Sequence, residues 1–588
     1  MQLVSPEDIL SVNKNLKYFG GKTIAKFILW VLKLDKCNRE YAKYYVLDSP
    51  DFLNKIIESF KLKYIVSEED LKKIPLSGPF ITVSNHPTGG SEGIALVKMM
   101  SQKRSDYKFL VNFLLSRIKP LEPYFLYVNP FETHKNMQSS MAGVKNALNH
   151  ISAGNSLGLF PAGEVSAFQK GKKEITDREW QTVALKLIKK AKVPVVPIYI
   201  EGRNSKFFYF LGKINPLLRT LKLPSELLNK KNQLLHFRIG MPISVNDQNL
   251  FEDITEYGNF LRMKTYTLGT DMLNKNRIVH DYRKIQSIVD AINPDILEKE
   301  INSLGEEQLL FKLENYRVFH SDASRIPYVM NEIGRLRELT YREVGEGTYK
   351  NIDLDHFDQF FHHLFIWDTD TKKIVGAYRM GKGKEIMKRR GIKGFYIESL
   401  FKINEQLYPV LEQSIELGRS FICKEYQRKA LSLFLLWKGI LYFLIKNPEY
   451  RYLIGPLSIS DSCSDFSKGL IVEFLKANYN HNELSKYIVP RTPFEYKVSE
   501  YIDTKVFLKY IGNDLNRLDK FIHDVEPPQH LPVLLKKYIK QNAKILGANV
   551  DPKFNFCLDV LMLLDIKDVP QEVIDSLSKE SAETINTI

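Results

Sequence analysis

The segment VSNHPTGGSEGIAL contains residue types that could move a proton at a reacting hydroxyl group. His86 follows the apolar run Phe80–Ser84, which predicts a buried strand, and Glu92 lies six residues further along the chain. Loops that follow the strands of α/β folds carry much of their chemistry. Gly89 and Gly90 allow a sharp turn, so the Glu92 carboxylate can reach back to the imidazole. A carboxylate that fixes one ring nitrogen leaves the other free to act as a general base.

Taken alone, this spacing is a weak signal, because such a pair is more often structural than catalytic. Two later segments strengthen the catalytic interpretation. FPAGEVS (160–166) is a predicted strand ending in a Pro/Gly turn, and VPVVPIYIEG (193–202) is a predicted buried strand with prolines at its start. No serine or cysteine stands in a nucleophile-elbow context, so the proton would come from the substrate itself.

In this order, NHPTGGSE, FPAGEVS and VPVVPIYI resemble the sequence blocks of the lysophospholipid acyltransferase family, over roughly residues 75–245. The resemblance implies a glycerolphosphate acyltransferase-like α/β domain. It also implies that His86 is the general base on an acceptor hydroxyl, which attacks an acyl thioester directly, with Glu92 as its acidic partner. The substrate-binding residues that it implies are Asn85, Phe160, Pro161, Gly163 and Glu164.

The sequence departs from that family at positions that matter for the acceptor. The acid is Glu rather than Asp and lies one residue further along. Val165 stands where the family has an arginine, and LYVNPFET (126–133) also lacks its usual arginine. Such arginines suit bidentate capture of a phosphate. Their absence predicts an acceptor without glycerol phosphate, unless Lys170, Lys172 and Lys173 substitute as point charges.

A second group of candidate residues lies in SIELGRSFICKEYQRKALSLFLLWKGI (414–440). A strand carrying Glu416 and Arg419 is followed by a short loop and a helix that begins near Gln427. Free N–H groups at a helix start, together with Arg428 and Lys429, would favour a phosphate or pyrophosphate. An ordinary helix with a basic first turn is the alternative.

The order of elements around this segment resembles the GNAT N-acyltransferase fold. Residues 330–339, 374–380, 415–422 and 452–459 are similar to the N-acyltransferases of ornithine- and glycine-lipid synthesis, over roughly residues 310–565. The phosphate-binding loop of that fold is degenerate here. This fits an acyl donor carried on acyl carrier protein, with acyl-CoA as the other option, and no bound cofactor.

Within this half, Glu416 is the candidate base for an acceptor amine, and Glu398 competes for that role. The arginines are candidates for binding the donor or the carboxylate of the acceptor, although each could equally be a surface charge. These are Arg335, Arg337, Arg419 and Arg428.

Strands alternating with helices in both halves predict two different α/β units, with a boundary near residue 290, so that the domains are 1–290 and 291–588. In the second unit the pattern predicts a helix with the face Val329, Ile333, Leu336 and Leu339. It also predicts a hairpin with its turn at Asp368–Lys372 and strands at 394–400, 415–422 and 452–457.

The composition limits the compartment and the partners. Its 44% hydrophobic and 26% charged residues indicate a folded protein, and the net charge of +15 suits acidic partners. Four scattered cysteines argue against a metal site or disulfides. Neither a signal peptide nor a membrane-spanning segment is predicted. Residues 19–36 mix aromatic and aliphatic residues with lysines, which fits either a membrane-interface helix or a core-facing helix with a basic edge.

Together the two halves resemble fused, hemolysin-type bifunctional synthases of aminolipids. The second half would N-acylate an amino acid, ornithine or glycine, with a 3-hydroxyacyl group, and the first half would O-acylate the resulting hydroxyl. We expect a peripheral protein at the cytoplasmic face of the inner membrane. Its expected partners are acyl carrier protein, the anionic membrane surface, an amino acid and a lyso-lipid.

Two other interpretations stay open at this point. One is a single-activity lysophospholipid (1-acylglycerol-3-phosphate) O-acyltransferase with a non-catalytic GNAT-like domain. The other is a basic binding protein without activity, although no motif supports nucleic acid.

Overall fold

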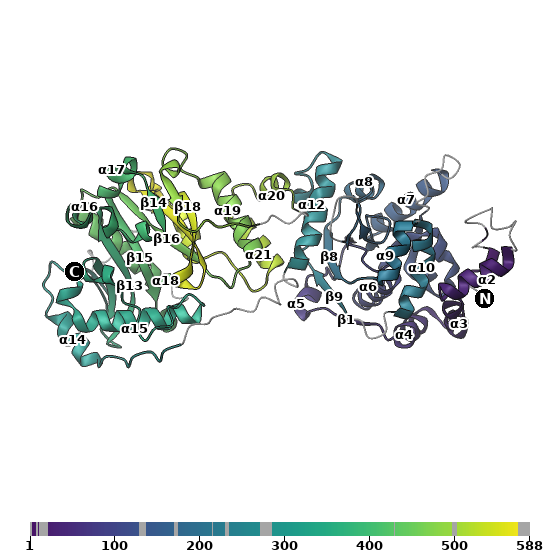
Figure 1. The fold of residues 1–588 in the computed structure, drawn as a ribbon, viewed down its shortest axis with the longest axis horizontal. Helices are drawn as coiled ribbons and strands as arrows, with labels where there is room; N and C mark the ends of the chain where they lie inside the picture. Colours follow the sequence, from purple (N-terminus) through teal and green to yellow (C-terminus); the bar gives the residue numbers. More distant parts are fainter. Residues whose placement is uncertain are drawn as a thin grey trace. The chain divides into compact units, whose positions relative to one another are not determined.

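The computed structural model describes residues 3–7, 10, 21–128, 137–169, 175–214, 216–229, 234–270, 285–427, 430–496, 502–573 and 575. Two compact units form this chain (Figure 1). The first contains residues 1–275 together with 499–512 and 523–527, and the second contains the rest. The prediction placed one boundary near residue 290, with each half continuous in sequence. In the structure, the late segments 499–512 and 523–527 belong to the first unit.

The first unit is built on a mostly parallel seven-stranded sheet of order β1-β9-β8-β2-β5-β3-β4. Only the β8–β9 pair is antiparallel among these neighbours. The strands are β1 (Lys63–Ile65), β2 (Ile81–Ser84), β3 (Lys108–Asn112), β4 (Phe125–Val128), β5 (Leu157–Leu159), β8 (Val195–Glu201) and β9 (Leu234–Ile239). A small hairpin, β6 (Ala167–Phe168) and β7 (Ile175–Thr176), lies outside this sheet.

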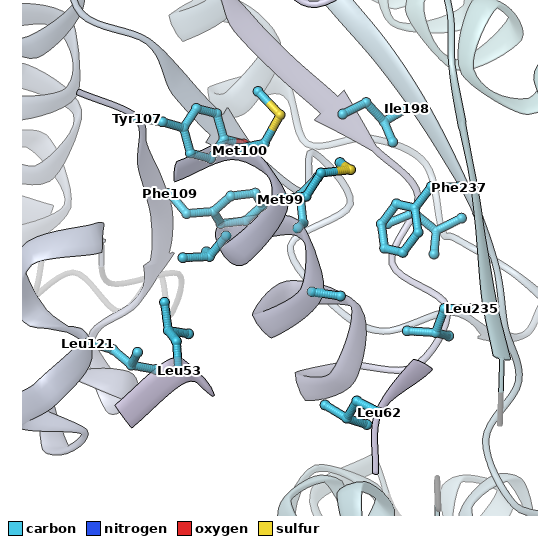
Figure 2. Close-up of a cluster of buried hydrophobic side chains, with 14 of the residues drawn as sticks. Leu53, Leu62, Met99, Met100, Tyr107, Phe109, Leu121, Ile198, Leu235 and Phe237 are labelled. Atoms are coloured by element: carbon cyan, nitrogen blue, oxygen red, sulfur yellow. The ribbon is translucent and has the colours of Figure 1, made fainter. Parts of the chain in front are cut away.

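The central strands β2 and β5 are buried along their whole length because helices cover both faces of the sheet. Figure 2 shows part of the core, in which side chains of α6 (Gly90–Lys103), including Met99 and Met100, pack against residues of the sheet. This packing fixes α6 against the sheet and therefore positions the loop between β2 and α6.

The remaining helices of the first unit are α2 (Gly21–Val31), α3 (Leu34–Tyr44), α4 (Ser49–Ser59), α5 (Glu68–Lys72), α7 (Met137–Ser152), α8 (Thr182–Ala191), α9 (Lys206–Ile214), α10 (Pro216–Asn229), α11 (Val245–Gln248), α12 (Ile254–Tyr266) and, from the late segment, α20 (Thr504–Ile511). Several begin at side-chain caps that satisfy free backbone N–H groups. Asp253, for example, accepts hydrogen bonds from the N–H groups of Thr255 and Glu256 at the start of α12.

The late segment 523–527 is held in the first unit by a buried charge. Asp524 accepts hydrogen bonds from the Lys73 ammonium at 3.0 Å and from the Met241 N–H, while the Arg238 guanidinium donates to its carbonyl oxygen. Lys264 lies 3.5 Å from the same carboxylate, which is 2% exposed. The late segment is therefore an integral part of the first unit.

The second unit is an α/β unit with an eight-stranded sheet of order β10-β11-β12-β13-β15-β16-β19-β18. All neighbours are antiparallel except β15 and β16. The strands are β10 (Leu309–Leu313), β11 (Tyr316–Asp322), β12 (His362–Asp368), β13 (Lys373–Lys382), β15 (Ser414–Ile422), β16 (Tyr452–Ile459), β18 (Lys544–Asp551) and β19 (Cys557–Asp565). A second small sheet pairs β14 (Phe401–Ile403) with β17 (Ile488–Pro490).

The helices of this unit are α14 (Pro294–Asn302), α15 (Pro327–Glu343), α16 (Gly383–Arg390), α17 (Tyr408–Glu412), α18 (Ala430–Lys446), α19 (Asp465–Tyr479) and α22 (Val533–Lys540), and α21 (Leu515–Val525) begins in it. None of the helices in the described ranges is long and apolar enough to cross a membrane.

The one parallel pair of this sheet separates along its length. β15 and β16 are paired only from Ser414–Tyr452 to Glu416–Ile454. Just beyond, β15 contains a β-bulge against β13, and Arg419 has a φ of 51° there. The bulge bends β15 and leaves the facing edges of the two strands free for a ligand.

Most of the elements predicted in the second half are present, with two corrections. The hairpin turn between β12 and β13 is confirmed. The strand predicted at 394–400 is wrong: these residues form short 3-10 turns, Ile392–Gly394 and Tyr396–Ser399. Leu339 was predicted on the buried face of α15 but is 42% exposed, because the buried positions in this part of the helix are taken by Arg337 and Glu338.

Candidate active sites

The loop between β2 and α6 brings His86 and Glu92 into contact. His86 Nδ1 lies 3.0 Å from Glu92 Oε1, but the angle at this contact is too bent for a linear hydrogen bond. The His86 side chain is 15% exposed and the Glu92 side chain is fully buried. The spacing of six residues had predicted this approach.

Glu92 is fixed by the backbone of the same loop. Oε1 accepts hydrogen bonds from the N–H groups of Thr88 at 2.7 Å and Gly89 at 2.6 Å, and the Thr88 hydroxyl donates to Oε2. Burial by itself would raise the pKa of Glu92, but the interactions with His86, Thr88 and Gly89 outweigh it and lower the pKa to about 2. Glu92 is therefore a fixed anion that orients the imidazole.

Phe160 holds the other side of the imidazole. Its ring stacks on the His86 ring, with centroids 3.8 Å apart and an interplanar angle of 17°. Since Nδ1 lies 3.0 Å from Glu92, Nε2 is the nitrogen left for a substrate. No described residue forms a hydrogen bond with Nε2, so the ring is set up to accept a proton there.

The backbone of His86 is held by residues that the sequence did not single out. Its N–H donates to Asp177 Oδ1 at 3.2 Å, and its carbonyl accepts from the Ser166 N–H at 2.8 Å. Ser166 Oγ also donates to Asp177 Oδ1 at 2.5 Å. Asp177 is a buried carboxylate whose pKa is raised by that burial. It lies 91 residues from His86 in sequence, and a lone aspartate there carries no motif.

The other predicted residues of the first half lie around this pair in different roles. Asn85 is buried, and its amide bonds the Ile200 backbone in both directions, which locks β2 to β8. Pro161 accepts from the Gln181 N–H. Gly163 has a φ of 70°, where a Cβ would approach the Gln181 amide to 2.2 Å, so only glycine fits this turn.

Glu164 points a carboxylate at two arginines from other elements. Oε1 lies 3.4 Å from Arg178 and Oε2 lies 3.2 Å from Arg219, which comes from α10. Val165, in the position where the family has arginine, packs instead in an apolar cluster with Phe208 and Tyr209. The guanidinium groups nearest this loop are thus already paired with an anion. Residues 129–133 of the second block and Lys170, Lys172 and Lys173 lie outside the described residues.

Helix α10 covers the glycine turn before α6. Gly89 has a φ of 101°, and a Cβ there would lie 2.7 Å from Leu223 Cδ2. A Cβ at Gly90 would lie 3.3 Å from Leu227, a tight contact. Gly89 is therefore required both by its backbone conformation and by the approach of α10.

The second unit contains a cavity of about 860 Å³ where β15 and β16 separate. Its polar lining includes Arg379, Tyr396, Arg419, Glu346 and Asp559. The rest is largely apolar, with side chains from α18, β16 and β19, such as Leu433, Leu436, Leu453, Met562 and Leu564. A cavity with one polar and one apolar part suits a substrate that has a reactive head and a fatty chain.

Glu416 lies beside this cavity rather than in its lining. Its carboxylate accepts hydrogen bonds from the N–H groups of Tyr396 at 3.0 Å and Ile397 at 2.8 Å. Burial raises the pKa of Glu416 to about 7, although both backbone bonds oppose that rise. Glu416 thus holds the turn that carries Tyr396, and Tyr396 does line the cavity.

Arginines and aspartates form a buried network behind the polar wall. Arg379 lies 2.7 Å from Asp355, and Arg419 lies 3.2 Å from the same side chain. Arg337, one of the predicted carboxylate binders, is fully buried and bonds Asp358 at 2.7 Å. Burial alone would raise the pKa of Asp358, but Arg337 and Arg379 reverse this and hold it well below its usual range. Of this network, only Arg379 and Arg419 line the cavity.

The remaining predicted residues of the second half are not brought to the cavity. Arg335 pairs with Glu332 within α15, at 2.6 Å. Glu398 pairs with Arg491. Arg428 and Lys429 lie outside the described residues. Among the residues that the structure describes, no group of three or more His, Cys, Asp or Glu side chains is arranged to hold a metal ion.

Two family models match the chain. An acyltransferase model matches residues 14–274, and an acetyltransferase (GNAT) domain model matches residues 336–438. The first range contains the His86–Glu92 pair, and the second contains Arg379, Tyr396 and Arg419 of the cavity lining.

Three relatives illustrate the similarity. A glycine N(alpha)-acyltransferase of Bacteroides thetaiotaomicron is 25% identical over 306 residues, 49% of this chain and 88% of the relative. A lyso-glycine lipid O-acyltransferase of Phocaeicola vulgatus is 29% identical over 278 residues, 45% of this chain and 95% of the relative. A second lyso-glycine lipid O-acyltransferase, from B. thetaiotaomicron, is 32% identical over 201 residues, 33% of this chain and 70% of the relative. The chain is therefore an acyltransferase that belongs to the family of the lyso-glycine lipid O-acyltransferases and carries a GNAT domain in addition.

Proposed function

We propose that this chain is a bifunctional acyltransferase of aminolipid synthesis. The second unit forms an amide between a 3-hydroxyacyl group and an amino acid such as glycine or ornithine, and the first unit esterifies the hydroxyl of that product. The observation that carries the proposal is the presence on one chain of the His86–Glu92 pair and the divided cavity of the second unit. The two kinds of relative, each similar to about half of the chain, support it.

In the first unit, the lyso-lipid hydroxyl gives its proton to His86 Nε2 as its oxygen attacks the acyl thioester. The new C–O bond forms, the C–S bond breaks, and the imidazolium returns the proton to the departing thiolate. Glu92, an anion held by Thr88 and Gly89, stabilises the imidazolium between these events. No covalent enzyme intermediate is needed.

The acceptor of the first unit is a lyso-lipid without a phosphate. Arg178 and Arg219, the cations next to the 160–166 loop, are both engaged by Glu164. An acceptor phosphate would have to compete with this carboxylate, whereas an N-acylated amino acid makes no such demand.

In the second unit, the acyl chain of the donor lies against the apolar lining and the thioester reaches the polar wall. The facing edges of β15 and β16, unpaired beyond Glu416 and Ile454, offer backbone groups to the amide-containing arm of an acyl thioester. The donor is acyl carrier protein or coenzyme A in its acylated form. Acyl carrier protein is strongly acidic, so the +15 charge favours it as a partner.

The first unit also has a surface suited to a membrane interface. Phe27 and Trp30 of α2 are 61% and 66% exposed, and Phe210 and Ile214 of α9 are 55% and 60% exposed. The opposite faces of these helices pack together, with Leu211 in the same cluster as Ala25 and Leu29. Lys22, Lys26, Lys206 and Lys213 are exposed on the same two helices. Aromatic side chains bordered by lysines bind anionic bilayers peripherally, and this supports a peripheral location at the cytoplasmic face of the inner membrane as part of the proposal.

Vesicle flotation tests this surface. With the triple variant Phe27→Ser, Trp30→Ser, Phe210→Ser, we expect binding to phosphatidylglycerol-containing vesicles to be lost. Leu76→Ser, at another 75% exposed position of the same unit, is the control and should bind as the wild type does. Equal binding by both variants would remove α2 and α9 from the proposal.

Lipid mass spectrometry after expression in a host without aminolipids tests the two activities together. We expect the wild type to yield a diacylated aminolipid, His86→Ala to accumulate the monoacylated amide, and Glu416→Ala to yield neither. Diacylated lipid from the His86 variant would refute the assignment of the first unit. If the Glu416 variant makes the monoacylated amide and the diacylated lipid in wild-type amounts, N-acylation does not require the turn that Glu416 holds and that carries Tyr396.

A further inference from the structure

The cavity of the second unit contains a carboxylate that the mechanism above does not use. Asp559, on β19, lines the cavity and is 3% exposed. Ser458, opposite it on β16, donates a hydrogen bond to Oδ1 at 2.6 Å, and Cys557 Sγ lies 3.8 Å from the same oxygen. No described residue bonds Oδ2. One carboxylate oxygen is thus fixed by the sheet and the other is left for a ligand in the cavity.

The two acids that line this cavity, Asp559 and Glu346, form no ion pair with its arginines. Arg379 and Arg419 are paired with Asp355. In contrast, no lysine, arginine or histidine of the described residues forms an ion pair with Asp559 or with Glu346, the second acid of the lining. The buried Lys468 ammonium lowers the pKa of Glu346 but is itself paired with Asp461 at 2.7 Å, so Asp559 is the acid on which no cation acts. Asp551, close to Asp559, accepts a hydrogen bond from the Tyr396 hydroxyl at 3.3 Å. A buried acid without a cation is unfavourable as an anion, so this wall favours a cationic ligand.

The acidities of these groups agree with that geometry. Burial raises the pKa of Asp559 to about 7, with Asp551 and Glu346 adding to the rise against the Ser458 hydrogen bond. Burial likewise raises the pKa of Glu346 to about 7. A proton acceptor works best when its pKa is close to the working pH.

We infer that Asp559 is the general base for the acceptor amine in the second unit, and that Glu346 binds the same ammonium group beside it. This inference rests on the proposed N-acylation. Asp559 Oδ2 takes one proton from the ammonium, and the free amine then attacks the thioester carbonyl. As the C–N bond forms and the C–S bond breaks, the nitrogen loses a second proton and the thiolate takes one up, so one proton in total is released. The carboxylate of the amino acid is left to face Arg419.

Steady-state N-acylation by the full-length protein, with acyl carrier protein carrying a 3-hydroxyacyl group and with glycine or ornithine, tests this role. Asp559→Asn keeps an oxygen for Ser458 but removes the base, and we expect kcat to fall by about 10²–10⁴-fold at pH 7, as for loss of a general base. The KM for the amino acid should change little. Glu346→Gln should instead raise that KM and leave most of kcat.

The matched control is Asp565→Asn, at the end of the same strand, where the carboxylate pairs with Arg451 outside the cavity. It should keep wild-type kinetics. The pH profile distinguishes a general base from a residue with only a structural role. The wild-type kcat should rise as the pH passes the pKa of Asp559, about 7, and Asp559→Asn should lose this rise. O-acylation of a supplied lyso-lipid, unchanged in all three variants, shows that the first unit is intact, and an unchanged thermal unfolding transition shows that the second unit, which carries the three substituted residues, is folded.

The outcomes separate the two claims. A wild type that acylates the amino acid, with an Asp559→Asn variant that keeps the wild-type kcat and pH profile, overturns the inference and leaves the proposed function standing. A wild type that forms no amide from any amino acid overturns the proposed function, and the inference falls with it.

Discussion

Glu92 Oε1 lies 3.0 Å from His86 Nδ1, and the Glu92 side chain has no exposed surface. A buried carboxylate in this position has two consequences that can be measured separately. It orients the catalytic imidazole, and it makes the stability of the first unit depend on acid.

The first prediction concerns acid. The pKa of Glu92 is about 2 in the folded protein and about 4.5 when unperturbed, so its stabilising contribution is present above pH 4.5 and is lost as the pH falls toward 2. A shift of this size corresponds to about 3 kcal/mol. In denaturant titrations of the first unit, Glu92→Gln should lower the stability at pH 7 and flatten its fall below pH 4.5. The exposed Glu69→Gln should leave the curve unchanged, and an equally steep curve for Glu92→Gln would contradict the assignment.

The second prediction concerns Gly89. Alanine at a φ of 101° is strained, and its Cβ would also approach Leu223 Cδ2 to 2.7 Å. We expect Gly89→Ala to lower the unfolding free energy by about 1–3 kcal/mol. O-acylation should decline as well, because the Gly89 N–H helps to hold Glu92. Gly78→Ala is the control: its φ is 74° but no atom lies within 4 Å of the added Cβ, so stability should fall while activity persists.

The third prediction concerns Glu416. Its pKa is raised to about 7, so its neutral form is the one that suits the fold. The contribution is therefore fully present below pH 4.5 and is lost as the pH rises through 7, by up to about 3 kcal/mol. Glu416→Gln cannot ionise, and the thermal midpoint of its second unit should fall less between pH 5 and 8 than that of the wild type. A parallel fall in both proteins would show that the Glu416 carboxylate is ionised throughout this range.

The fourth prediction concerns Asp524. Removing its carboxylate leaves Lys73 paired with Asp70 alone and takes from the largely buried Lys264 an anion 3.5 Å away. Loss of one partner from a buried pair costs about 3–5 kcal/mol, so Asp524→Ala should lower the temperature at which O-acylation is lost on heating. Glu256→Ala breaks a half-exposed contact to Lys509 on the other late segment, 499–512, and should cost less than about 1 kcal/mol. Equal losses in the two variants would contradict a buried anchor.

The sequence was most informative where the chemistry is local. His86, the glycine turn and Glu92 lie within seven residues, so their contact follows from strand, turn and helix geometry alone. Asp177 reaches the backbone of His86, and Arg219 reaches Glu164 in the 160–166 loop, both from distant segments, and a single sequence gives no sign of such approaches. The overall α/β organisation was likewise predictable from alternating apolar strands and helices.

The second site was harder to predict because its acids come from unrelated elements. Glu416 and Arg419 share a strand, but the bulge at Arg419 turns that side chain to the cavity while the Glu416 carboxylate bonds a neighbouring turn. The hairpin of β18 and β19, which carries Asp559, was not predicted. Its segment CLDVLMLLD is a continuous apolar run, and such runs do not distinguish strands from helices.

The membership of residues 523–527 in the first unit has a consequence for biosynthesis. A ribosome that has translated the first half has not yet made Asp524, whose carboxylate pairs with Lys73 and Lys264 and whose segment completes the first unit. Domains usually mature in the order of their synthesis, but here the N-terminal enzyme is completed only after most of the C-terminal one has emerged. The O-acyltransferase unit therefore completes its fold only after most of the N-acyltransferase unit, which supplies its substrate, has been translated.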